Sequence, residues 1–250
     1  MAAAKKPRPL EAFETNMADA RHLVGLAEAL TNTRARKMRR ELRERVGDAL
    51  KIPARLRSEL DCLQSSHLFV TFLPGSGIKR SDFDDARPLL RQALVAACAA
   101  TETYLADRTM ELIGRKIYAT KATKNLRAVA LTVDDWLWID AYYERKRVGL
   151  RNRVIEPYVR QQASTSPSKV GHLLSMIEVT DWAKQVDATR GATKGDTVAN
   201  LERITTRRNR IAHEGDRSGR GRASLTVAEV RADLDCLESI VTAIEAVSAA

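Results

Sequence analysis

The sequence has few of the residues that build tight turns and aromatic cores. Its 250 residues include 12 glycines and 7 prolines, and aromatic side chains make up 5%. Sandwiches and barrels need many turns, so this scarcity argues against an all-β fold. With few aromatic rings, the core must consist mainly of Leu, Val, Ile and Ala. The 44% of hydrophobic residues and 30% of charged residues are typical of a globular chain rather than a disordered one.

Cysteines and long apolar runs are also scarce. Cys62, Cys98 and Cys236 are widely spaced and form no Cys-x-x-Cys pair, which disfavours a thiolate zinc site. An odd cysteine count without a signal peptide indicates a reducing compartment. No stretch approaches the roughly 18 uninterrupted apolar residues that a membrane-spanning helix needs. We therefore expect a cytoplasmic protein that does not enter a membrane.

Several catalytic and cofactor motifs are missing. The sequence contains no HExxH, EF-hand, GxxxxGK or GxSxG pattern, and His22, His67 and His172 are isolated. Zinc hydrolases, nucleoside triphosphatases and serine hydrolases therefore find no support. We expect no metal and no other cofactor.

Positive charge, in contrast, is in excess. Lys and Arg number 42 and Asp and Glu number 32, which gives a net charge of +10. Such a field attracts polyanions, nucleic acid before anionic membrane, although it also serves solubility alone. Basic residues are dense in segments 34–45 and 144–153. Each segment either follows an RNA backbone or is solvated and held by ion pairs.

Apolar spacing and capping residues predict an all-α fold. The expected helices cover residues 10–30, 34–50, 82–117, 196–213 and 226–247, with shorter helices between 132 and 186. Thr132 with Asp135 is an N-cap, and Thr226 with Glu229 is a capping box. Residues 67–73 are the one candidate strand.

The chain divides into three parts. We expect a disordered basic tail over residues 1–9, an N-terminal helical region over 10–77 and a main helical domain over 78–250. The boundary is marked by Pro74–Gly77, a cluster of residues that ends regular structure.

The most informative segment is residues 201–217, LERITTRRNRIAHEGDR. On an ideal helix, Arg208 falls on the apolar stripe of Leu201, Ile204 and Ile211. A guanidinium on a core-facing stripe needs a partner, since an unpaired buried charge is costly. Glu102 on the 82–117 helix is the candidate partner, although a plain surface carboxylate is an equal alternative.

Asn209 and His213 lie four residues apart on the neighbouring stripe and can meet directly. Gly215 is placed as the C′ glycine of this helix, which puts His213 in its last turn. Histidine moves protons near neutral pH, and arginine holds phosphate oxygens in a fork. Alone, His213 would be a helix-end residue that bonds terminal carbonyls. Its combination with Arg208, Asn209 and Gly215 favours catalysis of phosphodiester chemistry.

The segment RRNRIAHEGD resembles the signature of HEPN-domain proteins, in which an arginine and a polar residue precede a histidine. Arg208, Asn209 and His213 match the form with four residues between arginine and histidine. The residue sequence of this segment is most similar to that of the RiboL-PSP-HEPN subgroup of prokaryotic proteins. The resemblance covers about residues 81–249 and implies a HEPN-like helical bundle, with residues 10–77 as an N-terminal helical extension.

The resemblance implies a metal-independent endoribonuclease that acts as a homodimer with a composite site. The 2′-hydroxyl of RNA attacks the adjacent phosphorus and leaves a 2′,3′-cyclic phosphate and a 5′-hydroxyl. His213 is then the general base or acid, Arg208 binds the scissile phosphate, and Asn209 positions the substrate or the histidine. Independently, Arg208 and His213 are about 140° apart around a helix, which favours a second copy that completes the site.

Further residues are assigned around this motif. The expected RNA contacts are Arg207, Arg210, Arg217, Arg220 and Arg222. The simpler interpretation leaves Arg207 and Arg210 solvated and makes residues 215–222 a flexible loop capped by Asp216. The aromatic cluster of Trp136, Trp138, Tyr142 and Tyr143 either stacks bases or belongs to the core, and the core is favoured.

The family resemblance also implies a role as a toxin or phage-defence effector, with an antitoxin or defence-system partner. Two other functions stay open. A non-catalytic HEPN-like module would bind RNA or a protein partner, because folds keep their scaffold after losing chemistry. A DNA-binding helical protein ranks last, since no helix-turn-helix signature is present. The intact trio of Arg208, Asn209 and His213 favours the enzyme.

Overall fold

The computed structural model describes residues 7–31, 40–62, 85–117, 122–219 and 221–249. Within these ranges every regular element is helical except one two-stranded sheet, so the predicted all-α fold is confirmed. The predicted strand at 67–73, the boundary at Pro74–Gly77 and most of the basic tail lie outside the described residues.

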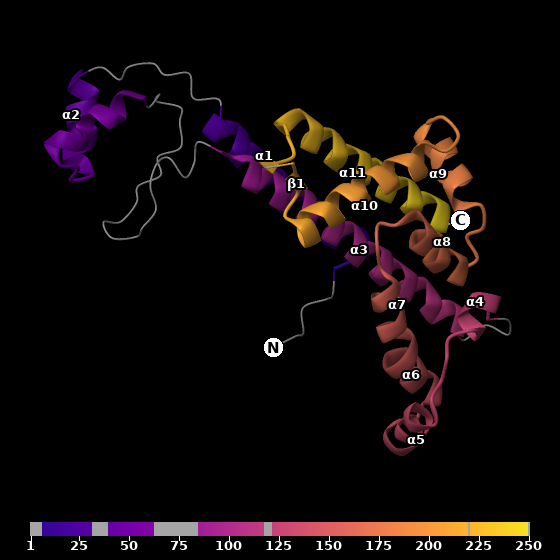
Figure 1. Cartoon of the computed structure of the whole chain (residues 1–250). Helices are drawn as coiled ribbons and strands as arrows, with labels where there is room; N and C mark the ends of the chain where they lie inside the picture. The colour runs from indigo at the N-terminus through magenta and orange to yellow at the C-terminus, as the bar shows by residue number, and fades with distance from the viewer. Residues whose placement is uncertain (1–6, 32–39, 63–84, 118–121, 220, 250) are drawn as a thin grey trace.

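The elements follow one another along the chain in the order shown in Figure 1. They are α1 (Pro9–Thr31), α2 (Arg40–Ala49), the 3-10 helix η1 (Ala54–Cys62), α3 (Arg87–Ile117), α4 (Lys124–Arg127), α5 (Val133–Tyr142), α6 (Lys146–Leu150), the π-helix η3 (Arg151–Ile155), α7 (Glu156–Gln162), α8 (Pro167–Met176), α9 (Trp182–Arg190), α10 (Asp196–Glu214), β1 (Arg217–Ser218), β2 (Gly221–Arg222) and α11 (Val227–Ala249).

The 31-residue helix α3 lies at the centre of the bundle, in contact with α1, α7, α8, α10 and α11 (Figure 1). Apolar spacing on α3 places six side chains on one face, of which Leu90, Leu94, Ala97, Thr101 and Leu105 are each at most 3% exposed. The sixth, Leu112, is half-buried. Thr101 is tolerated there because its hydroxyl donates to the backbone oxygen of Ala97, one turn back. One side of α3 is therefore a continuous apolar surface on which other helices pack.

The first helix, α1, packs on α3 and α11. Phe13, Met17, Ala20 and Val24, which recur at three- and four-residue steps, form one face of α1 and are buried. The ring of Phe13 lies 5.8 Å from that of Tyr104 on α3. Residues 9–31 therefore contribute to the same hydrophobic core as the later helices.

The two predicted helix starts are confirmed. At α5 the backbone N–H of Asp135 donates to Thr132 Oγ1 at 3.0 Å. At α11 the N–H of Thr226 donates to Glu229 Oε2 at 2.7 Å, and the N–H of Glu229 donates back to Thr226 Oγ1 at 3.2 Å. The second pair is the reciprocal capping box that the sequence predicted.

Candidate functional site

Helix α10 carries the motif, and its beginning is fixed by a residue of the preceding helix. Asp187 on α9 accepts from the backbone N–H groups of Gly195 at 2.7 Å and Thr197 at 2.9 Å. Burial alone raises the pKa of Asp187, but the hydrogen bonds from Thr197 and Gly195 outweigh it and lower that pKa. This cap was missed in the sequence because its donors follow eight and ten residues later.

The buried stripe of α10 is as predicted. Leu201, Ile204 and Ile211 are at most 9% exposed, and the Arg208 side chain is 24% exposed. Arg208 Nη2 donates to both carboxylate oxygens of Glu102, at 3.0 and 3.2 Å. The expected pairing of Arg208 with Glu102 is thus present, and it links α10 to the middle of α3.

Arg208 also contacts its neighbour in the motif. Its Nη1 donates to Asn209 Oδ1 at 3.1 Å. Asn209 and His213 are both exposed, as their place on the neighbouring stripe predicts. His213 forms no hydrogen bond or ion pair with any described residue. The structure therefore brings Arg208, Asn209 and Glu102 together and leaves the imidazole open at the surface.

The end of α10 is a left-handed cap. Gly215 has φ of 62°, the conformation predicted for the C′ glycine, and Asp216 follows with φ of 58°. The N–H of Asp216 donates to the backbone oxygen of Arg210 at 2.9 Å. Aspartate is among the few non-glycine residues that adopt this backbone region readily. The chain is thereby turned sharply back, and the Asp216 side chain enters the interior.

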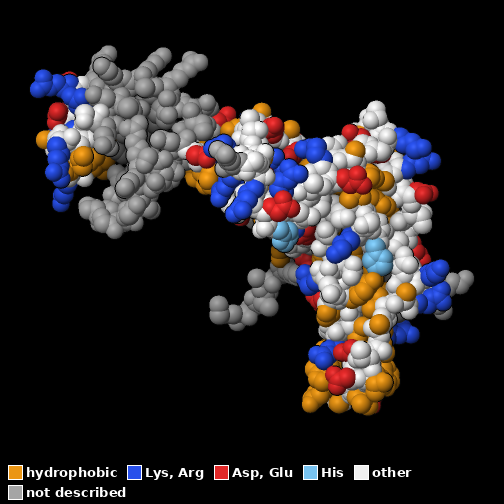
Figure 2. Space-filling model, viewed as in Figure 1, with side chains coloured by type: hydrophobic (Ala, Val, Ile, Leu, Met, Phe, Trp, Pro, Cys, Tyr) orange, Lys and Arg blue, Asp and Glu red, His pale blue; other side chains and the backbone are white. Residues whose placement is uncertain are grey.

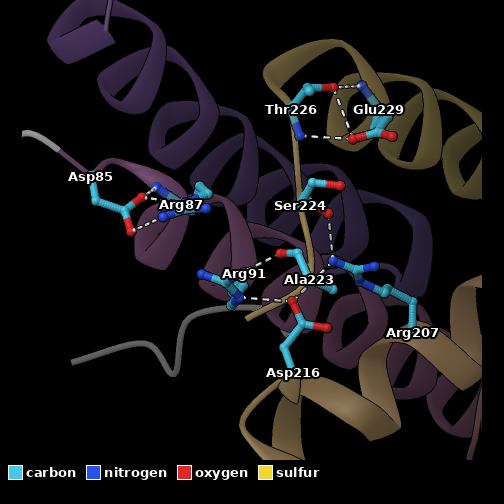
Figure 3. A network of polar contacts seen from close by, with 9 residues as sticks. All are labelled: Asp85, Arg87, Arg91, Arg207, Asp216, Ala223, Ser224, Thr226 and Glu229. Atoms are coloured by element: carbon cyan, nitrogen blue, oxygen red, sulfur yellow. Dashed lines mark hydrogen bonds and ion pairs between the residues drawn. The ribbon is translucent and has the colours of Figure 1, made fainter. Parts of the chain in front are cut away.

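Asp216 is the centre of a buried ion network, drawn in Figure 3. Its carboxylate is fully buried, and its Oδ2 accepts from Arg91 Nε at 2.8 Å and from Arg207 Nη2 at 2.9 Å. Arg91, on α3, is itself only 4% exposed. The capping role expected of Asp216 does not account for its buried carboxylate, and the simpler interpretation of Arg207 as merely solvated is wrong, because its guanidinium binds Asp216. The expected contact of Arg207 with RNA stays a prediction. Arg91 was missed; the available signal is that it lies three residues before the buried Leu94, a spacing that places both on one side of the helix.

The same two arginines hold the chain that follows the hairpin. Arg91 Nη2 donates to the oxygen of Ala223 at 3.0 Å, and Arg207 Nη2 donates to the oxygen of Ser224 at 2.8 Å. The N–H of Ala223 donates to the oxygen of Asp216 at 2.8 Å. Both ends of the segment between Asp216 and Ala223 are therefore tied to α3 and α10 (Figure 3).

This anchored segment is a small hairpin rather than the predicted flexible loop. β1 and β2 are antiparallel, with Arg217 opposite Arg222. The hairpin and the end of α10 border an open cleft of about 1010 Å³, which is lined by His213, Glu214, Arg217, Arg222 and three glycines. Of the other expected RNA contacts, Arg210 is exposed and Arg220 lies outside the described residues.

The aromatic cluster lies elsewhere. Trp136, Trp138 and Tyr142 are 47%, 37% and 72% exposed, so the favoured core interpretation is wrong for them. All three belong to α5, which lies at the bottom of Figure 1, away from β1. Figure 2 shows hydrophobic side chains gathered at the same tip of the molecule. Arg153 lies 5.0 Å over the ring of Trp138. The structure thus does not bring these aromatic side chains to the motif.

Within the described ranges the structure offers neither a cluster of metal ligands nor a membrane-spanning helix. No group of three or more His, Cys, Asp or Glu side chains there is placed to hold a metal ion. No helix in those ranges is long and apolar enough to cross a membrane.

Comparison with known proteins leaves the chain without an assigned family. No family model matches it, and neither does any curated protein or solved structure. The resemblance to HEPN proteins therefore rests on the motif of residues 207–216 and on its helical surroundings.

Proposed function

We propose that the chain is a metal-independent endoribonuclease of HEPN type that acts as a homodimer. The observation that supports this best is the end of α10. There His213 is exposed, Asn209 lies one turn before it, and the adjoining cleft is lined by Arg217 and Arg222. An open imidazole beside a cationic cleft suits a polyanionic substrate that needs proton transfer.

The proposed reaction needs no group from outside the protein and the RNA. His213 removes the proton of the 2′-hydroxyl, whose oxygen then bonds to the adjacent phosphorus. The bond from phosphorus to the 5′-oxygen breaks, and that oxygen takes a proton from the partner's His213. The products are a 2′,3′-cyclic phosphate and a 5′-hydroxyl. Arg208 stabilises the charge on the phosphorane oxygens, and Glu102 and Asn209 fix its guanidinium.

A second copy supplies what one helix lacks. Arg208 and His213 are about 140° apart around α10, so one chain does not aim both side chains at one phosphate. The polar face of α10 that would meet a second copy is exposed, with Glu202, Thr206, Asn209 and His213 on it. An interface on this face would place two histidines around a two-fold axis, with the Arg208 of each copy on the neighbouring stripe.

The resemblance extends the proposal to a biological role. We propose a toxin or phage-defence effector in the cytoplasm, with an antitoxin or another defence component as its partner. The N-terminal helices α1 and α2 would then be additions to the HEPN-like helical bundle that carries the motif.

One observation favours a second candidate, a non-catalytic HEPN-like module that binds RNA or protein. Glu102 and Asn209 already occupy Arg208 Nη2 and Nη1. An arginine that is neutralised in this way serves a structural role without chemistry, and a fold can retain such a pair after its activity is lost. In that case α10 would bind a partner through the same exposed face.

Cleavage of total RNA in EDTA separates the two functions. Wild type and the control His22→Ala, which changes an exposed histidine on α1, should both degrade RNA. Arg208→Ala and His213→Ala should not. RNA that is retarded on a gel but left intact by wild type would refute the nuclease and favour the binding module.

A further inference from the structure

The hairpin after α10 places two like charges directly opposite each other. Arg217 on β1 and Arg222 on β2 are cross-strand partners, and both are exposed. Neither guanidinium has an ion-pair partner among the described residues. Like charges opposite each other destabilise a ladder, so the hairpin must be held by other contacts.

Those other contacts also remove the hairpin's own carboxylate from the cleft. Asp216 is fully buried, and Arg91 and Arg207 bind it on the inner side. Glu214 is the one carboxylate in the described lining of the cleft, against Arg217 and Arg222. The hairpin thus presents the guanidinium groups of Arg217 and Arg222, which the buried Asp216 cannot neutralise.

The backbone around the cleft is open. A Cβ added to Gly215, Gly219 or Gly221 would meet no atom within 4 Å. Gly219 has φ of 58°, a left-handed backbone conformation that glycine adopts without strain. A ligand can therefore approach the hairpin closely, and side chains of a cross-strand pair, whose Cβ atoms are about 5 Å apart, can both reach one phosphate group.

We propose that Arg217 and Arg222 form a clamp for one backbone phosphate of the substrate, next to the phosphate that is cut. The buried network of Arg91, Asp216 and Arg207 holds this clamp beside His213. This proposal depends on the proposed ribonuclease function in one respect: it assumes that the phosphate to be cut lies at His213. It adds a substrate class: RNA with at least two phosphates, since a dinucleoside monophosphate leaves the clamp empty.

Binding to a 2′-O-methyl oligoribonucleotide tests the clamp without cleavage. For a single strand, the logarithm of the affinity falls with the logarithm of salt concentration, with a slope of about 0.7 for each phosphate neutralised. The double variant Arg217→Gln/Arg222→Gln should lower this slope by about 0.7. Both side chains are exposed, so an unchanged melting temperature is the check that the fold is intact.

The matched control removes the same amount of charge from residues that do not line the cleft. Lys184 and Lys194 are exposed, precede α10 in the chain and are not part of the cleft lining. Lys184→Gln/Lys194→Gln should leave the slope unchanged. An equal drop in both variants would mean that net charge alone is responsible and would overturn the clamp.

Cleavage assays separate failure of the clamp from failure of the nuclease. If the nuclease and the clamp are both correct, the arginine variant cuts an oligonucleotide at least tenfold less efficiently than wild type, in kcat/KM, but cuts a dinucleoside monophosphate equally well. Wild-type cleavage with an unchanged slope in the variant would refute the clamp alone. A lower slope without any wild-type cleavage would refute the nuclease and leave the clamp standing as an RNA-binding site.

Discussion

Replacing Asp216 by asparagine tests the anchor that holds the end of α10. The variant keeps the size of the side chain and tolerates the left-handed backbone, where φ is 58°, so it removes little besides the charge. Arg91, 4% exposed, and Arg207 then lose the negative charge that lies 2.8 Å and 2.9 Å from their donors. The amide oxygen of asparagine still accepts hydrogen bonds, but it does not neutralise the two guanidinium groups. Breaking a buried ion pair from one side costs about 3–5 kcal/mol, because the remaining charge stays buried without a partner.

Urea unfolding followed by circular dichroism measures this loss directly. A domain is typically stable by about 5–15 kcal/mol, so the predicted loss is a large share of the total. Asp235→Asn is the matched control. It breaks the ion pair of an exposed carboxylate, 59% accessible, with Arg21, and should cost about 0–1 kcal/mol. Equal losses in the two variants, both below about 1 kcal/mol, would refute the argument that the Asp216 network anchors the hairpin.

Three further predictions concern other parts of the fold. Asp187→Ala removes the cap of α10 and should lower the free energy of unfolding by about 1–2 kcal/mol at pH 7. Because folding lowers the pKa of Asp187, its stabilising contribution is present above the unfolded-state pKa and is lost as the pH falls through the folded-state pKa. Urea unfolding at pH 3 should therefore show a smaller difference between the variant and wild type. Burial raises the pKa of Cys98 to about 12, so iodoacetamide at pH 8 should leave Cys98 unmodified in the native protein and alkylate it in urea. Peptide mass spectrometry measures the modification, and labelling of the native protein would contradict the burial of Cys98. Trp136→Ala should change the free energy of unfolding by less than about 0.5 kcal/mol, since the side chain is 47% exposed, and a loss of several kcal/mol would mean that it belongs to a core.

Local rules were sufficient for much of the fold. The buried faces of α1 and α3, the capping box at Thr226 and the glycine that ends α10 follow from spacing and residue type over a few positions. The partnership of Arg208 with Glu102 was inferred across 106 residues, because an arginine on an apolar stripe needs a carboxylate and few lie on a packed face.

Contacts that join distant segments were beyond these rules. Asp216 and Arg91 are 125 positions apart, and nothing in the segment GDRSGRGR indicates that its aspartate is buried. The segment therefore resembled a flexible loop, whereas the ion network with α3 and α10 orders it into a hairpin. Arg91 and Arg207 bury the Asp216 carboxylate from two other helices, and spacing over a few positions does not contain such contacts.

The aromatic residues of α5 show a different limit. The scarcity of other aromatic residues favoured a place in the core, but α5 lies at the tip of the molecule, and Trp136 and Tyr142 are exposed there. Whether an apolar helix is covered depends on the arrangement of the other elements, and periodicity within that helix does not contain this information.

The chemistry of the RNA ends tests the central claim most directly. A defined oligoribonucleotide is incubated in EDTA with wild type, His213→Ala and the His22→Ala control, and mass spectrometry identifies the products. Wild type and control should leave a 2′,3′-cyclic phosphate and a 5′-hydroxyl, a 2′-deoxy residue at the cut position should block the reaction, and His213→Ala should leave the RNA intact. Cleavage by His213→Ala at the wild-type rate, or products with 5′-phosphates, would contradict the account.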